Sequence, residues 1–364
     1  MNIFRFSFKL IVQILFVIIF FSTLQAKNLD KFNKGNHISD YFSGILLFKE
    51  HQYSESYNFL KKLDGLEETH LDYSSRYLHS LVNLGKFGEA FNYSKKLEKR
   101  SQSNFESDLI VGIYYLKNEK YDLAQKYFLK IKNSKSSFIL HDFVSNSLIN
   151  WNSVSSLDLN NSQSKINLID SRFENLKNIQ NAFLHCFYKS PETELSFKKL
   201  ASNKKVDFSR YNYFYATYLV NSGKIDQAKK AINSSLKLYP RNLLLNQYKS
   251  DLDDGKYKSN FNCQNQSHVI AEIFYITANA LSSQSIYTFS NFYLSLAKYL
   301  NKNFHSFNTL LAENFYKTDN FTQAKKIYNE VGKKGNAFFW YAAKQNARIL
   351  IEEDKREEAL KILN

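Results

Sequence analysis

The side chains that could carry out acid–base, nucleophilic or metal chemistry are scattered through this 364-residue chain. No two of its eight histidines stand three or four residues apart, the spacing that places two metal ligands on one helix face. His185 stands beside Cys186, but successive residues of a helix point in different directions. Acidic pairs such as Asp253–Asp254 and Glu357–Glu358 are typical of a loop and of a first helical turn. Because phosphate-binding, nucleophile-elbow and His-Glu-x-x-His motifs are also absent from the sequence, we predict a protein that is not an enzyme and uses no metal or cofactor.

The two cysteines are far apart in sequence and leave two interpretations open. Cys186 lies in the apolar stretch AFLHCFY, where a buried free thiol is the simplest interpretation, and Cys263 lies in a polar stretch. Spacing alone does not show whether the two sulfur atoms can meet. The sequence therefore favours free thiols over a Cys186–Cys263 disulfide without deciding between them.

The composition favours long helices joined by short polar turns. Hydrophobic residues make up 44% of the chain and aromatic residues 16%, which is enough to bury a core and argues against disorder. Two prolines and ten glycines are too few for the many tight turns of a β-sandwich or barrel. We therefore predict an all-α fold.

A helix–turn–helix pattern recurs along the chain, most clearly in residues 104–132. Gly112 there precedes a second small residue, Ala124, by twelve positions, so that two paired helices can approach closely. The interval from Ser56 to Ala90 is 34 residues, and so is the interval from Ala90 to Ala124. The residues predicted to define the repeats are Gly44, Ala90, Gly112, Ala124, Ala182, Ala216, Ala228, Pro240, Ala278, Ala312, Ala324, Ala347 and Ala359.

This period and this placement of small residues resemble the tetratricopeptide-repeat (TPR) superfamily. The resemblance covers residues 37–364 and implies a right-handed α-solenoid of about nine helix–turn–helix repeats that holds another protein. In its layout the chain also resembles TPR proteins exported by alphaproteobacteria, because a signal-like segment precedes three regular repeats, a loose one and an insertion.

The pattern divides the chain into successive segments. A polar lead-in (residues 27–36) precedes an N-terminal array (residues 37–250), in which the repeat around residues 140–172 is degenerate. A polar insertion loop (residues 251–266) separates it from a C-terminal array (residues 267–364). The pattern stops in mid-helix, so we expect either a frayed last helix or, in preference, a fragment of a longer array.

The N-terminus has the pattern of a secretory signal peptide over residues 1–26. Two basic residues precede a nearly unbroken apolar run (residues 10–21), and the small residue Ala26 marks the exit site. The apolar run is shorter than the roughly 20 residues of a membrane-spanning helix. Leu24 is the third residue before the predicted cleavage site, a position where a small residue is preferred. An uncleaved membrane anchor is therefore the alternative. Either way we expect an exported chain that works in a periplasmic or other extracytoplasmic space.

The concave wall of such an array is the predicted binding surface. Positions five, nine and twelve of each first helix fall on one stripe by helical periodicity. The stripe is apolar in the N-terminal third of the chain and polar with charge in the C-terminal third. Its apolar members either bind a segment of another protein or simply pack between neighbouring repeats. The candidate groove residues are Tyr41, Ile45, Phe48, His79, Leu109, Ile113, Leu116, Tyr213, Thr217, Tyr275, Asn279, Tyr316 and Arg348.

These patterns support one leading hypothesis and two alternatives. The first is a non-enzymatic exported scaffold that binds another protein during envelope assembly or maturation. The second is a basic adaptor for anionic lipid or a cell-wall polymer, because the chain without residues 1–26 keeps 47 basic against 34 acidic residues. A helper module of an enzyme whose catalytic part lies beyond the given C-terminus is a distant third. Export and the dispersal of the lysines argue against a nucleic-acid partner.

Overall fold

The computed structural model describes residues 35–363, apart from residues 69, 135–138, 203–207 and 258. The predicted signal segment and most of the polar lead-in lie outside the described residues. No helix in the described part of the chain is long and apolar enough to span a membrane.

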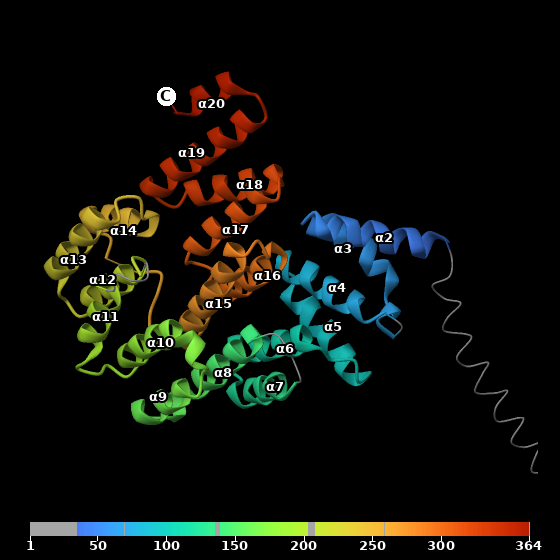
Figure 1. Ribbon diagram of the computed structural model, residues 1–364, viewed down its shortest axis with the longest axis horizontal. Helices are drawn as coiled ribbons and strands as arrows, with labels where there is room; N and C mark the ends of the chain where they lie inside the picture. Colours follow the sequence, from blue (N-terminus) through green and yellow to red (C-terminus); the bar gives the residue numbers. More distant parts are fainter. Residues whose placement is uncertain (1–34, 69, 135–138, 203–207, 258, 364) are drawn as a thin grey trace, which may run out of the picture. The chain divides into compact units, whose positions relative to one another are not determined.

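All regular structure in the described residues is helical, which confirms the predicted all-α fold (Figure 1). The α-helices are α2 (Gly35–Lys49), α3 (Tyr53–Leu60), α4 (Leu71–Asn83), α5 (Phe87–Lys99), α6 (Phe105–Lys117), α7 (Tyr121–Asn133), α8 (Ile139–Ser153), α9 (Leu159–Asn167), α10 (Glu174–Phe187), α11 (Thr193–Ala201), α12 (Tyr211–Asn221), α13 (Ile225–Leu238), α14 (Leu243–Asp253), α15 (Gln266–Ser283), α16 (Tyr287–Leu300), α17 (Ser306–Lys317), α18 (Phe321–Gly332), α19 (Asn336–Glu352) and α20 (Arg356–Leu363).

One turn geometry recurs between the two helices of eight pairs. In each turn one residue has a φ between 53° and 75°, in the left-handed region. The following N–H donates to the carbonyl five residues back at 2.7–2.9 Å, as in the Schellman motif that ends many helices. The left-handed residues are His51, Gly85, Glu119, Lys189, Gly223, Ser285, Asp319 and Asp354. The first three are 34 residues apart, so the backbone repeats with the period seen in the sequence.

The connection between α8 and α9 departs from this geometry. It is made by a short 3-10 helix, Val154–Ser156, in place of the left-handed turn. This pair corresponds to the repeat predicted to be degenerate. The α14 helix is followed by residues 254–265, which form the connection to α15.

The helix pair α6–α7 shows how one repeat is built. The Asn104 side chain accepts from the Ser107 N–H at 2.8 Å, and the Ser107 hydroxyl accepts from the Asn104 N–H, so a capping box begins α6. A Cβ added to Gly112 would lie 2.5 Å from the Phe128 ring, so only glycine allows this separation of α6 and α7. Close packing of the pair thus depends on the small residue that the sequence pattern singled out.

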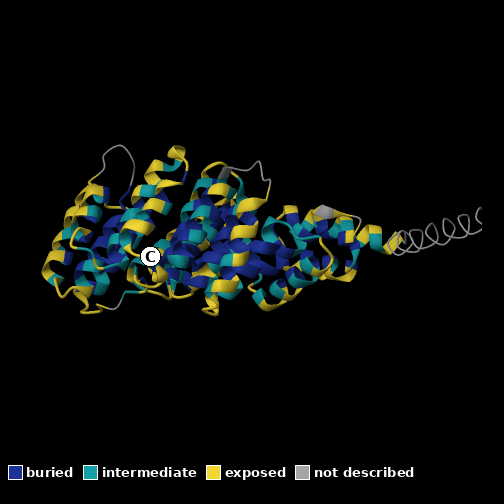
Figure 2. Cartoon of the chain, turned by 90° about the horizontal axis from the view of Figure 1, so that it is seen from below, coloured by how far each residue is buried: buried dark blue, intermediate teal, exposed yellow. Residues whose placement is uncertain are grey.

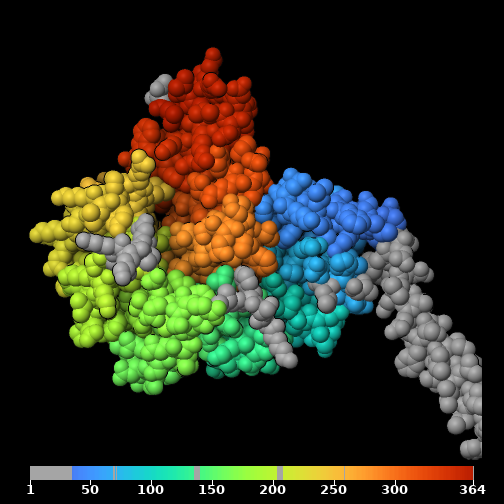
Figure 3. Space-filling model, in the orientation of Figure 1, coloured from blue at the N-terminus to red at the C-terminus, as the bar shows by residue number. Residues whose placement is uncertain are grey.

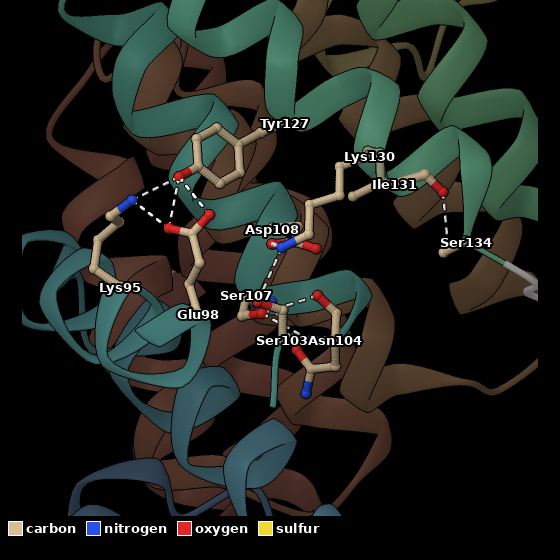
Figure 4. A network of polar contacts seen from close by, with 10 residues as sticks. All are labelled: Lys95, Glu98, Ser103, Asn104, Ser107, Asp108, Tyr127, Lys130, Ile131 and Ser134. Atoms are coloured by element: carbon tan, nitrogen blue, oxygen red, sulfur yellow. Dashed lines mark hydrogen bonds and ion pairs between the residues drawn. The ribbon is translucent and has the colours of Figure 1, made fainter. Parts of the chain in front are cut away.

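Polar contacts hold the same repeat to the preceding helix (Figure 4). The Tyr127 hydroxyl of α7 donates to the Glu98 carboxylate of α5 at 2.8 Å, and the Lys95 ammonium contacts both groups. Burial would raise the pKa of Glu98, but hydrogen bonds from Lys95 and Tyr127 lower it. Lys130 of α7 forms an ion pair at 2.8 Å with Asp108 of α6. The three helices therefore share charge-assisted contacts outside the apolar interface.

The chain separates into two compact units, residues 1–80 and residues 81–364, and the division falls within α4. In the described part of unit 1, a Cβ on Gly44 would lie 2.6 Å from Leu60, so α2 and α3 are as closely packed as α6 and α7. The Ser56 hydroxyl donates to the Gly44 carbonyl at 2.8 Å across this contact. The division differs in place from the boundary predicted at the insertion loop.

Unit 2 folds back on itself. After residues 254–265 the α15–α16 pair lies beside helices that precede it by more than a hundred residues, with α15 packed on α8 (Figures 1 and 3). The Lys117 ammonium at the end of α6 donates to the Leu300 carbonyl at the end of α16 at 3.0 Å. The Phe87 and Tyr299 rings stack with centroids 3.9 Å apart. Buried residues line the inner faces of the helices, and exposed residues lie on the outside (Figure 2).

Candidate functional site

The predicted groove residues on α6 are fully buried. Leu109, Ile113 and Leu116 each expose 1% or less of their surface. At the end of α6, the Lys117 ammonium donates to the Leu300 carbonyl at the end of α16 at 3.0 Å. The predicted apolar face of α6 is thus buried inside unit 2 and is closed to a partner in this conformation.

The two groove residues on α12 are buried in an aromatic cluster. The Tyr213 ring stacks on Phe304 with a centroid separation of 5.6 Å, and its hydroxyl lies 3.1 Å from that of Ser259. The Thr217 hydroxyl donates to the Phe214 carbonyl at 2.8 Å. Both residues therefore hold the fold together.

The groove residues of unit 1 pack between its neighbouring helices. Phe48 and His79 are buried, with ring centroids 6.0 Å apart. The Tyr41 hydroxyl contacts His70 and Arg76, and Ile45 is half-buried. This arrangement matches the alternative in which stripe residues fill the space between repeats.

The C-terminal end of the predicted groove is open. Arg348 is exposed on α19, and its guanidinium lies 3.9 Å from the centroid of the Tyr316 ring. Four exposed α19 residues at intervals of four, four and three positions share one helix face; they are Trp340, Lys344, Arg348 and Ile351. We call these four residues the α19 stripe. Trp340 is 56% exposed and Ile351 is 54% exposed.

Of the two cations of the α19 stripe, Arg348 stacks on the ring of Tyr316, whose hydroxyl donates to Glu352 at 3.1 Å. Within the described residues neither Lys344 nor Arg348 makes an ion pair with a carboxylate. Like charges four positions apart on a helix repel each other. A negatively charged partner would remove this repulsion, and the flanking Trp340 and Ile351 would supply apolar contact area.

Tyr275 and Asn279, the remaining groove residues, line a cavity of about 500 Å³ in unit 2. Arg210 lies in its wall, stacked 3.8 Å from the centroid of the Tyr275 ring. The guanidinium makes two hydrogen bonds to the buried Glu272 carboxylate, at 2.6 and 2.8 Å, and one to the Ser306 hydroxyl at 2.9 Å. Burial would lower the pKa of Arg210, but the Glu272 carboxylate raises it, so the guanidinium keeps its charge; burial raises the pKa of Glu272, and the bidentate contact with Arg210 opposes that rise.

Cys186 and Cys263 form a disulfide, so the preference for free thiols is wrong. Their Cα atoms are 6.0 Å apart, and the bond ties α10 to the loop before α15. The sequence could not show this, because the loop reaches α10 only when α15 folds back into unit 2.

The predicted repeat-defining positions are occupied by buried small residues. Ala90, Ala124, Ala216, Ala228, Ala278, Ala312 and Ala324 are each 0% exposed, and Ala182, Ala347 and Ala359 are 2% or less. They lie in helix pairs whose left-handed turns recur at 34 or 35 residues within each regular run of repeats. Pro240 is exposed after α13. The chain has a TPR-like fold.

Comparisons with known proteins assign no family to this chain. No family model matches the sequence, and no curated protein matches it. Among solved structures, the TPR domain of P58(IPK) is 15% identical, with coverage of 89% of this chain and 90% of that one and a TM-score of 0.25. Naa15/Naa10 bound to HypK is 12% identical over 90% and 67% (TM-score 0.23), and a human IFIT1 dimer with PPP-AAAA is 16% identical over 94% and 80% (TM-score 0.26).

The α19 stripe and the cavity around Arg210 are the candidate binding surfaces of the TPR-like body. In the described part of the chain no three His, Cys, Asp or Glu side chains converge on a position that could hold a metal ion. Sequence reasoning missed Trp340, although its place four residues before Lys344 would have put it on the same stripe.

Proposed function

We propose that this chain is an exported, non-enzymatic TPR-like scaffold that binds another protein through the α19 stripe. The observation that carries the proposal is the contrast within the predicted groove. The predicted groove residues on α6 are buried, whereas the stripe on α19 presents a tryptophan, two cations and an isoleucine to solvent. Exposed aromatic and arginine side chains are the residues most enriched at interface hot spots.

The chemistry of the stripe defines the partner. Two exposed cations favour a segment that carries carboxylates, and the apolar residues at each end favour aliphatic or aromatic side chains on the same segment. An amphipathic helix with an acidic and apolar face meets both requirements. We place this interaction in envelope assembly or maturation.

Two features support export. The N-terminal segment has the pattern of a signal peptide, and the Cys186–Cys263 disulfide suits an oxidising compartment. Cell fractionation tests this part, combined with maleimide labelling of the native protein before and after reduction. A chain found in the cytoplasm with two free thiols would contradict export.

Crosslinking in native envelopes tests the binding surface. Lys344→Glu combined with Arg348→Glu should lower recovery of the crosslinked partner by about tenfold or more, because two attractive contacts become repulsive. Lys230→Glu combined with Lys237→Glu makes the same change of net charge on exposed positions of α13 and should leave recovery unchanged. Equal recovery with both double variants would exclude the stripe as the binding surface.

The same variants separate protein binding from lipid binding. Flotation with anionic vesicles should show no binding that depends on Lys344 and Arg348. Vesicle binding that both double variants weaken equally, and that salt abolishes, would instead support the basic adaptor for anionic lipid.

A further inference from the structure

The cavity around Arg210 is walled by six parts of unit 2. We call it the Arg210 pocket; it lies among α10, residues 208–211, α14, α15, α17 and the first turn of α19. Most of its wall is apolar or aromatic and includes Leu176, Leu243, Ile276 and Phe338. Helices from both predicted arrays contribute, so the pocket exists only because unit 2 folds back on itself.

Arg210 is a charged side chain in the wall, and within the described residues some of its N–H groups donate no hydrogen bond. A guanidinium has five N–H groups, and the contacts to Glu272 and Ser306 use three of them. Two N–H groups remain on the terminal nitrogens of a side chain that lines the pocket and is 16% exposed. A buried donor without an acceptor is costly, so this site favours an oxygen atom brought in by a ligand.

The ion pair determines the charge of that ligand. Glu272 is fully buried and balances the charge of Arg210 with bidentate geometry. A ligand anion would place a second negative charge against this neutral pair, whereas a carbonyl or ether oxygen accepts the free N–H groups at no such cost.

The polar groups at the edge are also uncharged. The Asn242 amide donates to the Ser209 hydroxyl at 2.8 Å, and the Thr309 hydroxyl donates to the Ser306 carbonyl at 2.8 Å. Asn279 is exposed and can contact a ligand directly. Amide and hydroxyl groups around apolar walls are the usual composition of a small-molecule site.

The Arg210 pocket is too large to be filled by one protein side chain. At about 500 Å³ the pocket falls within the range of roughly 300–1,000 Å³ that holds drug-sized molecules. We propose that the Arg210 pocket binds a compact, uncharged, mainly apolar small molecule that presents one oxygen acceptor to Arg210. This makes the protein a ligand-binding module in addition to a scaffold.

Two fluorescent probes test the proposal on the full chain. Nile red is neutral, apolar and carries a carbonyl oxygen, whereas diphenylhexatriene is an apolar hydrocarbon without oxygen. Nile red should bind with one-to-one stoichiometry, and about tenfold or more tightly than the hydrocarbon, because only it satisfies the Arg210 donors. Equal affinity for the two probes would overturn the role of Arg210.

A pocket-filling variant tests the location. Ala280 lines the pocket and is half-buried, so Ala280→Trp should weaken Nile red binding by about tenfold or more by occupying the space. Ala231→Trp places the same side chain at a half-buried position of α13 outside the pocket and should bind Nile red like the parent. Thermal melting of both variants shows whether they are folded, and unchanged binding to folded Ala280→Trp would overturn the proposal.

Discussion

The α6–α7 pair and the packing of α15 onto earlier helices show two ways of joining helices in one chain. The α6–α7 pair connects neighbours in sequence through a turn at Glu119, and its close contact depends on Gly112 against Phe128. The α15 helix packs on helices distant in sequence, and three specific bonds hold it there. They are the Arg210–Glu272 ion pair, the Gln266–Ser155 hydrogen bond and the disulfide at Cys263, just before the helix.

This difference indicates that the packing within each repeat and the packing of α15 onto earlier helices of unit 2 have separate causes. Packing within a repeat needs only a small residue at a fixed place, so any repeat can pair in this way. Apolar faces alone would not select one partner for α15 among many similar helices. A buried ion pair and a disulfide supply that selection at two positions.

Removing the ion pair should cause the largest loss. Glu272→Ala leaves the Arg210 charge buried without a partner, so the free energy of unfolding should fall by about 3–5 kcal/mol. Chemical denaturation followed by circular dichroism measures this. Asp170→Ala removes the exposed pair with Arg172 and should change little. A small loss for Glu272→Ala would show that apolar contacts alone hold α15.

Removing the disulfide should have the second largest effect. The bond joins residues 77 positions apart, so replacing both cysteines by alanine should cost about 2–4 kcal/mol. Limited proteolysis should then cut within residues 254–265, while α6–α7 stays protected. Reductant should destabilise the parent protein and leave the double variant unaffected; equal sensitivity would contradict the role of the bond.

Overpacking the α6–α7 contact should cost less. Gly112→Ala places a methyl group 2.5 Å from the Phe128 ring, so we expect a loss of about 1–3 kcal/mol, measured by denaturation. A Cβ at Gly88 in α5 meets nothing within 4 Å, so Gly88→Ala should be neutral or stabilising. Similar behaviour of the two variants would mean that the contact is not tight in solution.

A histidine beside the closing loop should make unit 2 mildly sensitive to acid. The His268 Nδ1 accepts from the Asn262 N–H at 3.1 Å, and burial, with Lys117 nearby, lowers its pKa to about 4. Because the neutral form is favoured in the folded state, its contribution is complete above about pH 6.5 and is lost as pH falls towards 4. Between pH 7 and 5.5 the loss should be about 1 kcal/mol. The variant His268→Gln should flatten this slope in denaturation curves; an unchanged slope would assign it to other groups.

The sequence was enough to predict the repeats, but not the packing of α15 and α16 onto earlier helices. The 34-residue period and the buried alanines follow from contacts between neighbours, which leave a regular trace in the sequence. The left-handed turn residues Glu119, Ser285 and Asp319 left no such trace, because the Schellman hydrogen bonds hold that conformation without glycine. The burial of the apolar residues on α6 was likewise hidden, since an apolar stripe has the same pattern whether a partner or the rest of the chain covers it.

The contact between Lys117 and Leu300 has a consequence for how the protein is made. These residues are 183 positions apart, so α6 is complete long before α16 exists. At roughly 5–20 residues per second, on the order of ten to forty seconds of synthesis separate them. During that time the end of α6 at Lys117 lacks its contact with α16, and a chaperone that shields the incomplete unit until the C-terminal third arrives would limit aggregation of the newborn chain.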